Sequence, residues 1–269
     1  MSLLLLATAL AAGSAPLEPL SEAGHAIEAG RLEQARIMIS EAVKSGAKGD
    51  PIDRLLADLA FESGDFQTAQ ARYSVLLGAH SGDLGLAERA GIAALHTGDL
   101  ARAAILLERA TTSPTASWRA WNARGVAADL RGEWDVADHA YSKALALQPD
   151  RPETVNNLGW SLLLRGRWTE ALEQLNRAAA LAPNNQRTAD NLDLARTAAS
   201  HDLPQRRSNE SDNDWAARLN DAGMMSRARG DQKRAIAAFS QAIDARSQWY
   251  ERAANNLAAA QAGLAQAGQ

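Results

Sequence analysis

The sequence predicts an all-α protein in which short helical hairpins stack into a right-handed α-solenoid, and three observations predict it. Glycine recurs every 34 residues, and alanine stands five residues after each of these glycines. Pro149 and Pro183 are also 34 residues apart. A fixed period is typical of repeat architectures, in which each repeat contacts its neighbours and no single core forms. The glycines are Gly30, Gly64, Gly98, Gly132 and Gly166, and the alanines are Ala35, Ala69, Ala103, Ala137 and Ala171.

Each repeat is predicted to be two helices joined at its glycine. In the most regular repeat Gly166 separates the helical patterns 155–165 and 169–181, as a left-handed glycine does at a helix C-terminus. Glycine or alanine stands seven residues before each turn glycine. We expect this small residue to face the alanine of the second helix where the two helices cross closely. Pro149 and Pro183 end second helices, because proline cannot continue a helix.

This spacing of small, aromatic and proline residues resembles the tetratricopeptide repeat. The resemblance implies helix-turn-helix repeats stacked as an α-solenoid. The alternative, an irregular alanine-rich helical domain, leaves the common period unexplained. The five repeats that carry the pattern are 17–48, 50–81, 84–115, 118–149 and 152–183.

The segments outside these repeats differ in composition. Residues 1–15 hold an apolar run followed by small residues, which indicates a signal peptide cleaved after Ala15, although no basic residue precedes the run. The alternatives are a helix packed on the first repeat and a start codon assigned too late. Residues 16–199 are predicted to form the five tandem repeats with a capping helix. Residues 200–213 are polar and aperiodic and predict a linker, and 214–269 predict one more repeat with its own capping helix.

Composition excludes several function classes. The 269 residues carry a formal net charge of −4, which disfavours a nucleic-acid interface, since such interfaces need clustered positive charge. No cysteine is present, so disulfides, thiolate metal sites and cysteine nucleophiles are excluded. We find no phosphate-binding loop, serine-hydrolase or zinc-protease motif. The sequence therefore predicts no catalytic residue, no metal, no cofactor and no transmembrane span.

The remaining candidate is a surface. In stacked helical hairpins the first helices line the concave side, which forms a groove for a peptide or partner helix. We expect a protein or peptide partner there, and the oligomeric state stays open. The groove residues are predicted to be Arg119, Asn122, Val126, Asn156, Asn157 and Trp160, with Arg89, Ile92 and Asn191 on the flanking helices.

Two of these assignments have structural alternatives. An amide offers a donor and an acceptor for a partner's backbone, but Asn122 and Asn156 can equally be solvated or capping residues. Trp160 can pack between repeats instead of contacting a ligand, because large aromatic side chains are mostly buried.

Within the tetratricopeptide proteins, the run NNLGWSLLLRGRWTEALEQLNRAAALAPNN at 156–185, followed by DNLDLARTAA at 190–199, resembles TadD-type proteins of bacterial tight adherence (Tad) pilus assembly. That resemblance implies a scaffold for pilus assembly or secretion in the periplasm or cell envelope. The alternative is a cytoplasmic adaptor or co-chaperone. An enzyme with an unrecognised site is the third reading, and no set of residues supports it.

Overall fold

The computed structural model describes residues 17–200, 203–246, 248 and 250–267. The predicted signal peptide, 1–15, lies outside these residues. The described part of the chain holds fourteen α-helices and no strand. The chain divides into two compact units, one ending at Ala116 and the other beginning at Ser117. Each unit is described by itself below.

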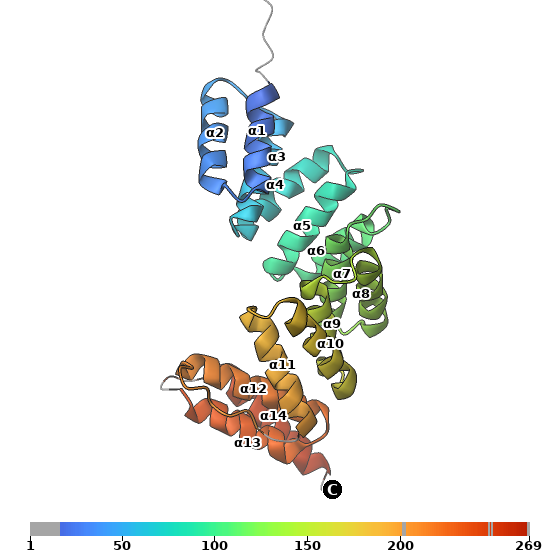
Figure 1. Cartoon of the computed structure of the whole chain (residues 1–269), viewed down its shortest axis with the longest axis vertical. Coiled ribbons are helices and arrows are strands. Elements are labelled where there is room, and N and C mark those ends of the chain that lie inside the picture. Colours follow the sequence, from blue (N-terminus) through green and yellow to red (C-terminus); the bar gives the residue numbers. More distant parts are fainter. Residues whose placement is uncertain (1–16, 201–202, 247, 249, 268–269) are drawn as a thin grey trace, which may run out of the picture. The chain divides into compact units, whose positions relative to one another are not determined.

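The N-terminal unit is made of three helical hairpins (Figure 1). Within each hairpin the first helix packs along the second, and α4 also packs against α5. The helices are α1 (Leu17–Glu28), α2 (Leu32–Lys44), α3 (Asp50–Glu62), α4 (Phe66–Ala79), α5 (Leu84–His96) and α6 (Leu100–Ala110).

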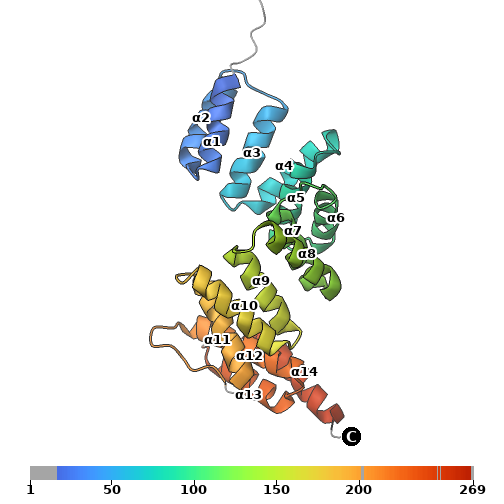
Figure 2. The ribbon, with the colours of Figure 1, turned by 45° about the vertical axis from the view of Figure 1, so that its right-hand side comes forward.

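The C-terminal unit continues the same pattern (Figure 2). The hairpins α7/α8, α9/α10 and α12/α13 are the most extensive pairings, while α11 packs against α10 and α14 covers α13. The helices are α7 (Trp118–Arg131), α8 (Trp134–Leu147), α9 (Pro152–Leu164), α10 (Trp168–Leu181), α11 (Gln186–Ser200), α12 (Asp212–Ala228), α13 (Gln232–Asp244) and α14 (Glu251–Ala267).

The turn glycines adopt the conformation that the sequence predicts. Gly132 has φ 73° and Gly166 has φ 75°, a left-handed region that L residues with a side chain rarely adopt. The glycine at the same place in the other hairpins also has positive φ: Gly30, Gly64, Gly98 and Gly230. The 34-residue period therefore marks the turn of each hairpin.

At Gly125 and Gly159 the small residue of the first helix lies closest to a large side chain of the second helix and not to its alanine, so that expectation was wrong there. A Cβ on Gly125 would lie 2.6 Å from Cε1 of Tyr141, and one on Gly159 would lie 2.6 Å from Cγ of Leu175. These partners stand nine residues after the turn glycine, not five. A bare Cα leaves room for a large side chain to lie flat on the first helix, which fills space that two small residues would leave empty. The five repeat alanines are nevertheless fully buried.

The hydrophobic core of the C-terminal unit continues past the fifth repeat. Leu163 of α9, Leu175 of α10, Ala195 of α11 and Met225 of α12 belong to one buried cluster. Helix α11 packs against α10 of the fifth repeat and also against α12. Helix α12 begins at Asp212, two residues before the predicted start at 214, because the hydroxyl of Ser211 caps it by accepting a hydrogen bond from the backbone N–H of Asp214.

Candidate partner-binding surface

Two of the nine predicted groove residues, Arg89 and Ile92, lie on α5 of the N-terminal unit. The guanidinium of Arg89 lies 3.4 Å from the carboxylate of Glu62 and 3.5 Å from that of Asp58. It also lies over the ring of Phe61, at 5.6 Å from the centroid. Arg89 is therefore bound to α3, and Ile92 beside it is half-buried.

The other seven residues lie on α7, α9 and α11 of the C-terminal unit, where four asparagines form two pairs. The amide nitrogen of Asn157 donates to the amide oxygen of Asn122 at 3.2 Å. The amide nitrogen of Asn191 donates to the amide oxygen of Asn156 at 2.9 Å. Both pairs join residues 35 positions apart, so the first pair links α7 to α9 and the second links α9 to α11. Helix α11 follows α10 where the first helix of a further repeat would stand, and we count it with the first helices below. We call these four residues the amide stretch.

Asn156 fits neither alternative considered from the sequence, solvation or helix capping. Asn156 is only 3% exposed, and its amide oxygen is used by Asn191. Asn122, Asn157 and Asn191 are half-buried and keep part of their surface accessible. Asn156 therefore positions α11 against α9, while the other three asparagines present polar surface.

The remaining residues of the predicted groove differ in accessibility. Trp160 is half-buried and packs against the cluster shared by α9 to α12, and Val126 packs against the cluster around Tyr141. Arg119 is exposed and lies over the ring of Trp118 at 4.8 Å, and Arg151 lies over the same ring at 4.1 Å. Such cation–π contacts fix the guanidinium groups near the start of α7.

A buried polar network behind this surface was not predicted from the sequence. Asp129 of α7 accepts hydrogen bonds from the hydroxyl of Tyr141 at 2.7 Å and from the hydroxyl of Ser161 at 2.6 Å. Burial raises the pKa of Asp129 above the ordinary aspartate value, against the lowering effect of these two donors. The network connects α7 to α8 within one hairpin and to α9 of the next, so it sets the spacing of the first helices.

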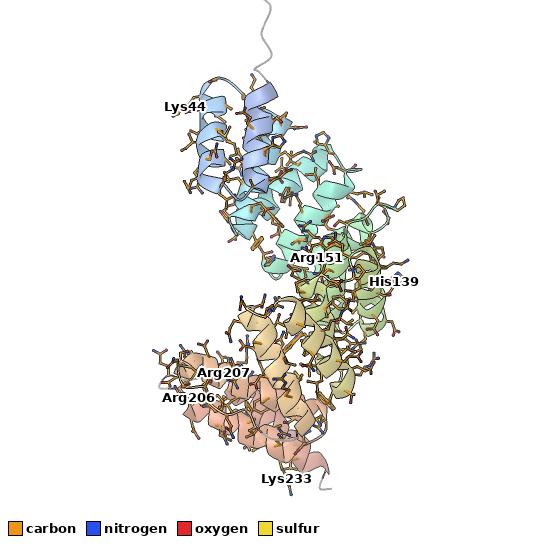
Figure 3. The ribbon with its side chains drawn as sticks, in the orientation of Figure 1. Lys44, His139, Arg151, Arg206, Arg207 and Lys233 are labelled. Atoms are coloured by element: carbon orange, nitrogen blue, oxygen red, sulfur yellow. The ribbon has the colours of Figure 1, made fainter. Side chains whose placement is uncertain are left out.

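The segment that joins α11 to α12 is held down by ion pairs. We call its residues 203–211 the strap (Figure 2). The guanidinium of Arg207 pairs with Asp190 and lies 3.5 Å from Asp193, both on α11. Arg218 of α12 pairs with Asp193 at 2.7 Å and with Glu210 of the strap at 2.8 Å. Figure 3 shows Arg206 and Arg207 on the strap beside α12.

The strap, α11 and α12 enclose a groove of about 750 Å³. Its wall on α11 includes Asn191 of the amide stretch. Arg187, also in this wall, donates to the amide oxygen of Asn157 at 3.5 Å. The groove therefore adjoins the amide stretch on α11. One signal of the groove is visible in the sequence, the basic pair Arg206-Arg207 with acidic residues close behind.

The described part of the chain shows no metal site and no membrane-spanning helix. Among the described residues no three His, Asp or Glu side chains are placed to hold a metal ion. Over the same residues no helix is both long and apolar enough to cross a membrane.

Comparison with known proteins identifies the repeat. The sequence model of the tetratricopeptide repeat matches residues 54–117 and 122–186. These two segments include most of α3 to α10. No curated protein matches the chain.

Several solved structures share the fold. PilW, described as a widely conserved type IV pilus biogenesis factor, is 16% identical with a TM-score of 0.55, over 89% of this chain and 97% of that chain. A tetratricopeptide repeat protein from Parabacteroides merdae is 15% identical with a TM-score of 0.54, over 91% and 98%. A thermophilic repeat protein of Thermus thermophilus is 24% identical with a TM-score of 0.53, over 66% and 97%. At these identities the similarity concerns the fold alone.

Proposed function

We propose that the chain, whose residues 54–117 and 122–186 match the tetratricopeptide-repeat model, is a non-catalytic scaffold that binds a protein partner on the first helices of its C-terminal unit. The observation that carries this proposal is the amide stretch. Its two asparagine pairs hold α7, α9 and α11 in register, so that polar groups repeat along one surface. A peptide in extended conformation presents backbone donors and acceptors at regular intervals, and such a surface can bind them.

The amide stretch keeps hydrogen-bonding groups for a partner. Asn122 uses its amide oxygen in the pair with Asn157, and its amide nitrogen donates no hydrogen bond within the described residues. Asn191 uses its amide nitrogen in the pair with Asn156, and its amide oxygen accepts no hydrogen bond within the described residues. One donor and one acceptor are thus available on different first helices. Together they suit an N–H and a C=O of one peptide backbone.

We further propose that this scaffold works in the bacterial envelope, in pilus assembly or secretion. Two features of the sequence support this, the apolar segment at 1–15 and the resemblance of 156–199 to TadD-type proteins. The similarity to PilW concerns the fold and adds no argument about the pathway. Fractionation of cells that produce the tagged chain tests the location. Recovery in the cytoplasm at full length would favour the adaptor or co-chaperone alternative.

Affinity capture of the tagged chain followed by mass spectrometry tests the binding function. The captured partner, once purified, is measured against Asn122→Ala with Asn157→Ala, which we expect to weaken binding about tenfold through the loss of hydrogen bonds. The matched control is Lys143→Ala with Glu173→Ala, two exposed residues on the second helices α8 and α10. Equal binding by the asparagine variant, with loss in the control, would place the partner on the second helices.

A further inference from the structure

The groove enclosed by α11, the strap and α12 carries an inference that rests on the proposed scaffold function and names the chemistry of its partner. We infer that this groove binds an extended segment of the partner through a basic side chain, whose charge lies against Asp214 and Asp221. Cavities of this size bury much of a bound ligand. The groove's volume, about 750 Å³, therefore admits a short stretch of peptide.

Two carboxylates in the groove are hydrogen-bonded to neutral groups. Asp214 and Asp221 both line it from α12, with Ala217 between them, as expected of residues on one helix face. Asp214 accepts a hydrogen bond from the hydroxyl of Ser211 at 2.7 Å, and Asp221 is bonded to the amide nitrogen of Asn220 at 3.4 Å. Neither makes an ion pair within the described residues. At 1.5 Å per residue their backbones are about 10 Å apart, so one long basic side chain can reach either.

Two of the three arginines of the groove are already paired with carboxylates, and the third, Arg187, donates to the amide oxygen of Asn157. Arg207 pairs with Asp190 and lies near Asp193, and Arg218 pairs with Asp193 and Glu210. Four carboxylates and three guanidinium groups line the groove, which leaves one negative charge in excess. Beside the groove, Asp193 engages two of these arginines, and the positive charge of Arg252, which lowers the pKa of Asp221, offsets the charge of Asp193. The electrostatic balance therefore favours a cationic ligand over an anionic or neutral one.

Arg207 shows how this wall accommodates a guanidinium. It reaches α11 from an irregular segment, as a partner peptide would, and lies between two aspartates one helical turn apart. Asp221 makes no ion pair within the described residues, and burial raises its pKa above the ordinary aspartate value, against smaller lowering effects of Asn220 and Arg252. A cation beside Asp221 would offset that desolvation.

A peptide library displayed on phage tests the inference with the full chain as bait. Random twelve-residue peptides are selected, and a winning peptide is synthesised and titrated by fluorescence anisotropy. We expect Lys or Arg at a fixed position of the selected peptides. Asp221→Asn should weaken binding of the synthetic peptide about tenfold, the size expected for a hydrogen bond to a charged group. Asp214→Asn should weaken its binding less. Asp135→Asn, an exposed residue of α8, is the matched control and should bind as the wild type does.

A double-mutant cycle shows whether the two charges meet. The same peptide is made with norleucine in place of its basic residue, and Asp221→Asn should then have no further effect on its binding. Melting curves by circular dichroism verify that each variant is folded. Selected peptides without a basic preference, or equal loss for both peptides, would overturn the inference and leave the scaffold function standing. Failure to select any peptide would count against both.

Discussion

The amide stretch and the strap-covered end of α11 occupy neighbouring parts of one surface and differ in chemistry. Residues 122, 156 and 190 are 34 apart and therefore equivalent in the repeat, yet they are Asn, Asn and Asp. The two asparagines are each bonded to an asparagine of the next first helix. Asp190 is paired instead with Arg207 from outside the repeat.

This comparison indicates that the repeat period determines where a side chain lies, and that the residue type determines which hydrogen-bonding or charged partner it needs. An amide carries donor and acceptor, so a second amide satisfies it without a change in net charge. A carboxylate that is partly removed from water needs a positive charge nearby. The strap supplies that charge on α11, and it thereby turns the end of an open surface into a groove.

The largest expected effect on stability lies in the ion pairs between the strap and α12. Arg218→Met should lower the free energy of unfolding by about 3 kcal/mol, because it leaves the Glu210 carboxylate enclosed without its partner. The side chain of Glu210 is 5% exposed and that of Arg218 is 13% exposed. Urea denaturation followed by circular dichroism measures the change. The control is Arg206→Met, whose pair with Asp212 is exposed and should contribute less than about 1 kcal/mol. Equal losses would show that the strap is only a surface loop.

An intermediate effect on stability is expected where α9 crosses α10. The position of the amide stretch depends on that packing. Gly159→Ala places a Cβ 2.6 Å from Cγ of Leu175. We expect a loss of about 2 kcal/mol in the free energy of unfolding, because an overpacked crossing forces the helices apart. Ala180→Leu, at an exposed position of α10, is the control and should change it little. An unchanged denaturation midpoint for Gly159→Ala would mean that the crossing can relax.

The smallest effect is expected in the amide stretch itself. Asn156→Ala should cost about 1 kcal/mol, the usual contribution of one neutral hydrogen bond. The cost should be the same at low and high salt, whereas the cost of Arg218→Met should change, because salt acts on charges. Denaturation midpoints at two salt concentrations measure both. A strong salt dependence for Asn156→Ala would remove the distinction between the two regions.

The sequence predicted the parts of this structure that a period can fix. The turn glycines and the buried alanines occur where their spacing places them. The period does not determine side-chain rotamers. We therefore expected Gly125 and Gly159 to face the alanine of the second helix, whereas each lies against the large side chain four residues after that alanine.

Contacts between repeats could not be predicted from the sequence for a different reason. The asparagine pairs join residues 35 apart, and that offset depends on how far one first helix is shifted along the next. The strap has no period, so nothing in the sequence sets its register against α11. Its charges could be recognised, but the choice of Asp190 and Asp193 as partners of Arg207 comes from tertiary structure alone.

Site-specific photo-crosslinking tests the central claim, that a protein partner binds on the first helices of the C-terminal unit. A photoreactive amino acid is placed at Asn122 of α7 in one variant and at Lys143 of α8 in another, and each is irradiated with the captured partner. The account predicts a crosslinked partner from position 122 and none from position 143. A crosslink from position 143 alone would contradict it and move the binding surface to the second helices.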